Sequence, residues 1–271
     1  MVHDYSAGIL ALCAVMRDQR ADIREWVDYH YLYGVDKFYI FDDDSKDPAL
    51  DILQDYISNG VVHYIEHAKE FLGVEHPLQP GFDYCIKEWG PLHKWMGFID
   101  IDEFILRPGI SIPDVLERYA ASAAVALNWK VFGSSGFEMR PGGVAHYTKC
   151  TPPEAYPSYF VKCIVQPRHT IRSLCVGHEF EYHPGGRVAV NVEGNSTTLK
   201  RSWSIPPAYS YLYINHYQVK SKQEFFEMKI PRGTGDGNSG PNEEYFQHIE
   251  AAATADCMPL QWPRPRTVGG G

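Results

Sequence analysis

The chain has 271 residues, of which 44% are hydrophobic and 22% charged, and this ordinary globular balance excludes a disordered, collagen-like or coiled-coil protein. Its 25 basic and 34 acidic side chains give a formal net charge of −9. This charge argues against a nucleic-acid polymer as partner, because neutralising many phosphates needs clustered Lys and Arg. It does not exclude a single nucleotide, whose diphosphate can be held by a metal ion between carboxylates.

The first part of the chain alternates short apolar runs with helical stretches, which is typical of βαβ units and a mainly parallel sheet. The expected strands cover residues 9–16, 37–41, 61–65 and 95–99, and the expected helices cover 21–34, 48–57 and 82–89. The first run is apolar almost throughout, as in a strand covered on both faces. It is too short to span a membrane, and no other run approaches the ~18 apolar residues required, so we expect a soluble chain without a transmembrane segment.

The pattern changes after about residue 110. A strand-like run at 123–132 precedes a segment rich in Gly, Pro, Tyr and His, which predicts antiparallel strands and loops added to the sheet. Two late helices are expected at 222–229 and 242–253. Because no repeat or clean linker divides the chain, we expect one domain over 1–258, with parts at about 1–110 and 111–258, and a flexible tail at 259–271.

The six cysteines form no CxxC pair and no zinc-ligand spacing. Free, buried thiols are therefore expected.

Two acidic clusters follow expected strands, and open α/β sheets bind ligands beyond the carboxyl ends of their strands. Asp100 and Asp102 follow the run at 95–99. Residues i and i+2 share a face of a strand, so these two carboxylates can point together while Ile101 enters the core. Two converging carboxylates favour a cation between them, and oxygen donors favour Mg²⁺ or Mn²⁺. The alternative is a solvated acidic loop.

Asp42, Asp43 and Asp44 form the second cluster, in which alternation places Asp42 and Asp44 on one face. A carboxylate at the end of the second strand of a βαβ unit commonly accepts hydrogen bonds from a ribose or base. A turn or helix cap before Pro48 is the alternative. The sequence has no GxGxxG or GxxxxGK[ST] motif after the first strand, so neither a classical dinucleotide site nor a P-loop is predicted.

A series of ordered motifs resembles family 92 glycosyltransferases and their bacterial relatives. The motifs are DIREWVDYHYLYGVDKFYIFDDDSKD, WMGFIDIDEF, NWKVFGSSG, KCIVQPRH and INHYQVKSKQEFFEMKIPRG, within residues 9–235. The resemblance implies an α/β fold of GT-A type, with a mainly parallel Rossmann-like sheet flanked by helices and a smaller antiparallel acceptor-side region. Residues 1–110 would form the nucleotide-binding half and 111–258 the acceptor half.

The implied activity is metal-dependent, inverting transfer of a hexose, with galactose favoured, from a UDP-sugar to a hydroxyl of a glycan acceptor. Asp102 would bind the Mn²⁺ or Mg²⁺ ion on the donor diphosphate. Asp100 would contact the ribose or the metal, and His216 would be a ligand of the metal or the diphosphate. The nucleotide contacts implied for the uridine are Arg17, Asp42, Asp43 and Asp44, and those for phosphate are Lys220 and Arg232. Relatives usually have Asn-Glu after the first basic residue, whereas this chain has Arg17-Asp18-Gln19.

Inversion by direct displacement also needs a base that takes the acceptor proton. The candidates, in order, are Asp236, Glu103 and Glu138. Glu103 would lie on the opposite strand face from Asp102 by simple alternation, unless the chain turns there. His178 is a weaker candidate for an acceptor or phosphate contact, and Trp129 could stack on a sugar or belong to the core.

Two other functions compete with a glycosyltransferase. One is a nucleotide-sugar-binding module without catalysis, and the other is a metal-dependent phosphoesterase that uses the DIDE cluster. A cytoplasmic location is favoured, with the Golgi lumen as the expectation if an N-terminal anchor has been removed.

Overall fold

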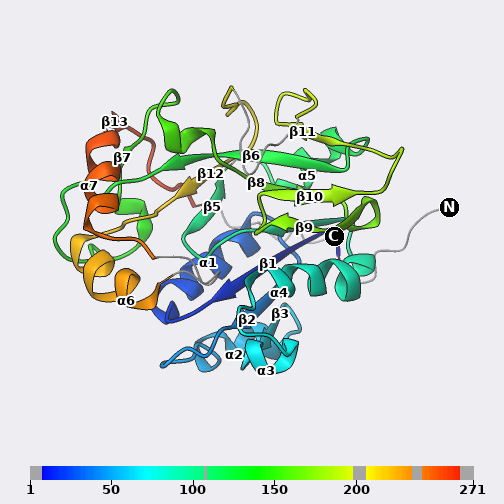
Figure 1. Ribbon diagram of the computed structural model, residues 1–271, viewed down its shortest axis with the longest axis horizontal. Coiled ribbons are helices and arrows are strands. Elements are labelled where there is room, and N and C mark those ends of the chain that lie inside the picture. The colour runs from blue at the N-terminus through cyan, green and yellow to red at the C-terminus, as the bar shows by residue number, and fades with distance from the viewer. Residues whose placement is uncertain (1–7, 107–108, 198–205, 234–239, 263–271) are drawn as a thin grey trace, which may run out of the picture.

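The computed structural model describes residues 8–106, 109–197, 206–233 and 240–262, and its centre is a nine-stranded sheet (Figure 1). The strand order is β3-β2-β1-β4-β8-β6-β12-β5, and β11 also pairs with β6. The first four strands in this order run parallel: β1 (Leu10–Met16), β2 (Lys37–Asp42), β3 (Val62–Ile65) and β4 (Trp95–Phe98). The expected α/β class and the parallel first half are confirmed.

The second half is a mixture of parallel and antiparallel strands. Here β8 (Val161–Val165) runs antiparallel to both β4 and β6 (Ala124–Val131). By contrast, β12 (Tyr213–His216) and β11 (Ala189–Asn191) are parallel to β6, and β12 is antiparallel to β5 (Glu103–Leu106). Two separate two-stranded antiparallel sheets lie outside the main sheet. They pair β9 (Thr170–Cys175) with β10 (Glu179–Tyr182), and β7 (Lys149–Cys150) with β13 (Ala255–Asp256).

Helices flank this sheet. The expected ones are present, with shifted ends, as α1 (Arg20–Leu32), α2 (Gln54–Ser58), α4 (Leu78–Tyr84) with a π-helical continuation at Cys85–Trp89, the π-helical segment Glu224–Lys229, and α7 (Glu243–Ala252). Three short helices were not expected: α3 (Ala68–Leu72), α5 (Ile112–Leu116) and α6 (Ile230–Arg232). They are too short to show a helical period in the sequence. Among the described residues no helix is long and apolar enough to cross a bilayer.

The central strand β1 is buried on both faces. Leu10, Leu12 and Ala14 belong to one hydrophobic cluster, whereas Ala11 and Cys13 belong to the cluster on the other face. This alternation explains why the run is apolar throughout. Helix α1 covers the first of these faces and is fastened to β5 by two buried side-chain donors: Trp26 Nε1 donates to the Glu103 carbonyl (2.9 Å) and Tyr29 Oη to that of Ile105 (3.2 Å). The start of β5, which directly follows Asp100 and Asp102, is therefore fixed against α1.

The expectation of free thiols is wrong for one pair. Cys150 and Cys257 form a disulfide with a Cα–Cα distance of 5.9 Å, while Cys13, Cys85 and Cys163 are free and buried. The two bridged residues are 107 positions apart and meet because β13 pairs with β7. A pairing of that kind leaves no local spacing motif in the sequence.

The start of the expected flexible tail is packed. Leu260 is buried, the carbonyl of Gln261 accepts a hydrogen bond from Tyr33 Oη (3.0 Å), and the ring of Trp262 lies edge-on to Tyr29. Residues 259–262 therefore belong to the domain, and residues 263–271 lie outside the described residues.

His30, in α1, makes the stability of this fold depend on pH. Its Nδ1–H donates to the Trp26 carbonyl (2.9 Å) and its Nε2 accepts from the Ile105 amide (3.2 Å), so the neutral ring is fully satisfied. Burial lowers its pKa from 6.5 to about 3. Because the folded pKa is depressed, the stabilisation is present above pH 6.5 and is lost as the pH falls toward 3.

We therefore expect His30 alone to remove about 2 kcal/mol from the free energy of unfolding between pH 7.5 and pH 5.0. Urea titrations at the two pH values measure this change. His30→Gln should show a loss that is smaller by that amount, whereas the exposed His248→Gln should follow wild type. An equal loss in wild type and His30→Gln would contradict the assignment.

Candidate active site

A pocket of about 260 Å³ lies at the carboxyl ends of the parallel strands. This volume is close to the lower end of the roughly 300–1,000 Å³ typical of small-molecule sites. Its charged and aromatic lining comes from segments far apart in the chain: Arg17 after β1, Asp43 after β2, Asp100 and Asp102 after β4, Trp129 in β6, Lys162 in β8, His178 before β10, His216 at the end of β12, and Lys229 and Arg232 in and after the π-helical segment. The fold thus gathers many of the predicted site residues in one place.

The acidic motif after β4 is a turn and does not continue as a strand. The Glu103 amide donates to the Asp100 carbonyl (3.0 Å), and the Asp100 amide donates back to Glu103 Oε2 (2.9 Å). The predicted strand alternation is therefore wrong here, although Asp100 and Asp102 both still line the pocket. The turn directs Glu103 inward, where its side chain is completely buried and burial raises its pKa well above the usual value despite the nearby charge of Lys162. The carboxyl group is thus out of reach of an acceptor, which argues against its predicted role as base.

Asp102 contacts two other side chains of the pocket lining. Its Oδ1 lies 3.4 Å from His216 Nε2, and its Oδ2 accepts a hydrogen bond from Lys229 Nζ (2.9 Å). Burial by itself would raise the pKa of Asp102, but Lys229 and then His216 outweigh it and hold the pKa well below the usual value. Asp102 is therefore ionised at neutral pH, and burial lowers the pKa of the neighbouring His216, which favours its neutral imidazole form.

Lys162 supplies a positive charge beside Asp100 and Glu103, the two ends of the acidic turn. It is buried within β8, where its Nζ lies 3.0 Å from Asp100 Oδ2 and 3.9 Å from Glu103 Oε2, and it donates to the Val176 carbonyl (3.3 Å). Burial would lower its pKa, but the charges of Asp100 and Glu103 outweigh this and raise it. Lys162 is not among the predicted site residues. The available signal was a single charge inside the otherwise apolar run Val161–Val165.

At the other end of the pocket, Arg17 forms an ion pair with Asp43, through Nε at 2.9 Å and a second contact from Nη2. Asp43 is 2% exposed, and its Oδ1 accepts no hydrogen bond within the described residues, although Lys69 Nζ lies 3.5 Å away. A buried acceptor of this kind suits a ligand that brings an N–H or O–H group.

The other two residues of the aspartate cluster do not line the pocket. Asp42 is occupied by its own turn, where it accepts hydrogen bonds from the Ser45 amide (2.8 Å) and from the Tyr64 hydroxyl. Asp44 is about half exposed and pairs with His67 (3.2 Å). The prediction that all three aspartates line one pocket is therefore wrong: only Asp43 does, because alternation at the strand end directs it away from its two neighbours.

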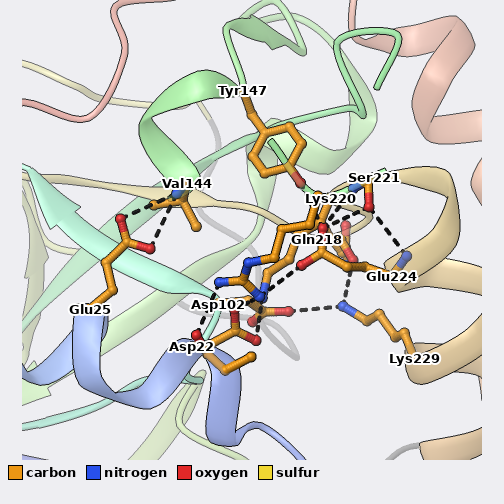
Figure 2. A network of polar contacts seen from close by, with 12 residues as sticks. Asp22, Glu25, Asp102, Val144, Tyr147, Gln218, Lys220, Ser221, Glu224 and Lys229 are labelled. Atoms are coloured by element: carbon orange, nitrogen blue, oxygen red, sulfur yellow. Dashed lines mark hydrogen bonds and ion pairs between the residues drawn. The ribbon is translucent and has the colours of Figure 1, made fainter. Parts of the chain in front are cut away.

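A buried network lies beside the pocket and holds Lys220 (Figure 2). Its ammonium group pairs with Asp22 of α1 (2.6 Å), and Arg140 pairs with both Asp22 (2.8 Å) and Glu224 (3.0 Å). Glu224 also accepts hydrogen bonds from the hydroxyls of Tyr147 and Ser221, both at 2.7 Å. Lys220 is therefore committed to a structural ion pair, which argues against its predicted phosphate contact.

Some of the remaining candidates line the pocket and others do not. Arg232 lines the pocket, as expected for a phosphate contact. Glu138 is 77% exposed, pairs with Lys222 (3.5 Å) and is absent from the pocket lining. Asp236 lies outside the described residues. His178 and Trp129 line the pocket, but Trp129 is 8% exposed and its ring is packed between those of Phe160 and His216, so core packing is its main role.

The described side chains offer a partial metal site. Among them no group of three or more Asp, Glu, His or Cys residues forms a ready-made cage. Divalent cations at nucleotide sites are commonly held by one or two carboxylates together with the phosphates. The adjacent Asp102 Oδ1 and His216 Nε2 fit that requirement. Asp100 also lines the pocket, with its Oδ2 paired to Lys162.

These features define an α/β protein with a polar small-molecule pocket at the carboxyl ends of its parallel strands, where open α/β sheets bind nucleotides. The chain belongs to glycosyltransferase family 92, whose family model matches residues 13–230. The resemblance inferred from the motifs is thereby confirmed.

Several known proteins are similar to the chain. A glycosyltransferase family 92 protein of Oryza sativa subsp. japonica is 27% identical, with 95% of this chain and 42% of the relative covered. The galactan beta-1,4-galactosyltransferase GALS2 of Arabidopsis thaliana is 31% identical over 94 residues, which cover 33% of this chain and 18% of that protein. Among solved structures, S. aureus TarS in complex with UDP has a TM-score of 0.38 and 13% identity, with 59% of this chain and 47% of TarS covered. The chain spans less than half the length of the full-length family 92 relatives it matches.

Proposed function

We propose that this protein transfers a hexose from a UDP-sugar to a hydroxyl of a glycan acceptor, with inversion and with Mn²⁺ or Mg²⁺. Family membership supports glycosyl transfer, and the partial similarity to a galactosyltransferase supports galactose as the hexose. The observation that carries the proposal is the pairing of Asp102 with His216 in the same pocket as the Arg17–Asp43 pair. One pair suits the diphosphate and its cation, and the other suits the nucleoside.

The residues divide the work by position. The Oδ1 atom of Asp43, which accepts no hydrogen bond within the described residues, would accept one from the uracil or ribose. Asp102 and His216 would hold the cation, which when bound offsets the charge that develops on the departing diphosphate. Arg232, which lines the pocket together with Lys229, would add a further positive charge. All four of these residues line one pocket, so their charges and hydrogen-bonding groups would act together on a bound donor.

The base that takes the acceptor proton remains a proposal. Glu103 is buried and Glu138 lies outside the pocket lining, which leaves Asp236 as the preferred candidate from the sequence. Its replacement by Asn should lower turnover while leaving UDP binding intact.

The experiment is a donor screen in which the purified chain, MnCl₂ and UDP-hexoses are incubated with and without glycan acceptors, and release of UDP and of new glycoside is measured. We expect UDP release that depends on Mn²⁺ and is greatest with UDP-galactose. Binding of UDP without any turnover would favour the binding-module alternative. Release of inorganic phosphate without a glycoside would favour the phosphoesterase alternative, and no binding of UDP would overturn the proposal.

A further inference from the structure

The three aspartates that line the pocket are each paired with a cation that also lines it. These pairs are Arg17–Asp43, Lys162–Asp100 and Lys229–Asp102. Without a ligand the protein thus neutralises its own carboxylates. A ligand that brings both a divalent cation and a diphosphate must rearrange at least one of these pairs. The two lysines that pair with Asp100 and Asp102 differ in how firmly they are held.

Lys162 is fixed. Its side chain is 2% exposed and its Nζ has two carboxylates and one carbonyl around it. Lys229 is held more loosely. Its side chain is 20% exposed, its Nζ has one carboxylate, Asp102, and the carbonyl of Gln218 (2.5 Å), and it lines both the main pocket and a smaller neighbouring cavity. Figure 2 shows Lys229 reaching Asp102 from the π-helical segment.

Asp102 presents different oxygens to its two partners: Oδ1 to His216 and Oδ2 to Lys229. A divalent cation on Asp102 and His216 would therefore lie close to the ammonium group, and like charges at such a distance repel strongly in a partly buried site. An anion placed between them removes that repulsion. The diphosphate of a nucleotide sugar is an anion of the required kind.

We propose that Lys229 is a further leaving-group residue: it holds Asp102 in the ligand-free protein and exchanges this partner for the diphosphate when the donor binds. This inference rests on the proposed function. It makes the protein's affinity for the cation and its affinity for the nucleotide depend on Lys229 with opposite signs, because the ammonium group competes with the cation for Asp102 but attracts the diphosphate.

The test compares wild type, Lys229→Met, Lys229→Gln, Lys229→Arg and the control Lys222→Met, which removes a half-exposed lysine from the residues just before the same π-helical segment. Calorimetry measures binding of MnCl₂ alone and of UDP in saturating MnCl₂. In both Lys229→Met and Lys229→Gln we expect MnCl₂ to bind about tenfold more tightly and UDP about tenfold more weakly. Lys229→Arg should lie near wild type for both ligands, as should Lys222→Met.

Weaker binding of both MnCl₂ and UDP in the neutral variants would show that Lys229 only supports the local structure. Unchanged UDP binding would show that Lys229 does not contact the diphosphate. Either result overturns the inference. Neither result affects the proposed function while wild type binds UDP. If wild type itself fails to bind UDP in MnCl₂, the proposed function fails first.

Discussion

Asp102→Asn is expected to lower the turnover of UDP-hexose about 10²–10³-fold, because it removes the charge on which the cation, His216 and Lys229 all depend. The substitution is nearly isosteric, so the loss is chemical. Steady-state assays across a series of MnCl₂ concentrations measure it, and the apparent affinity for MnCl₂ should fall together with turnover.

The matched control is Asp256→Asn, which removes an exposed carboxylate that pairs with Lys149 at the surface. It should retain wild-type turnover. A thermal melt of Asp102→Asn close to that of wild type would establish that the fold is intact. Turnover within a factor of three of wild type in Asp102→Asn would contradict the assignment of the site.

Lys162→Met is expected to lower the free energy of unfolding by about 3 kcal/mol. The Lys162 side chain is buried, and its replacement by Met removes the ion pair with Asp100 and the hydrogen bond to the Val176 carbonyl. Urea titration measures the loss. The control Lys130→Met removes a partly buried lysine of the neighbouring strand β6, whose ammonium group lies over the ring of Tyr213, and it should cost well under half as much.

A double-mutant cycle with Asp100→Asn separates the ion pair from simple packing. We expect a coupling energy of about 1–3 kcal/mol between positions 162 and 100. A coupling near zero would mean that the ammonium group stabilises the fold through its other partners, Glu103 and the Val176 carbonyl, and not through Asp100.

The parallel half of the fold was predictable because its signals are local. Hydrophobic periodicity predicts the strand before Arg17 and the helix that carries the apolar stripe of Ile23, Trp26 and Val27. The acidic residues that follow two strands predict a site at the strand ends. The same reasoning failed where a local conformation broke the period. At Asp100–Glu103 a turn replaces the strand and buries the glutamate.

Contacts between residues far apart in the sequence were the other feature that could not be predicted. Nothing near Cys150 in the sequence indicates Cys257, and nothing near Asp102 indicates Lys229, which lies 127 positions further along the chain. Likewise, the commitment of Lys220 to Asp22 depends on how the segment after β12 packs on α1. Family motifs indicated which segments matter. Which lysine of the last motif lines the main pocket depends on how that segment packs, and the sequence alone did not indicate Lys229.

The most direct measurement for the central claim is a crystal structure of the chain with UDP and MnCl₂. We predict the uridine beside Arg17 and Asp43, Mn²⁺ on Asp102 and His216, and the diphosphate within reach of Lys229 and Arg232. UDP bound elsewhere, or Mn²⁺ held without Asp102, would contradict the account.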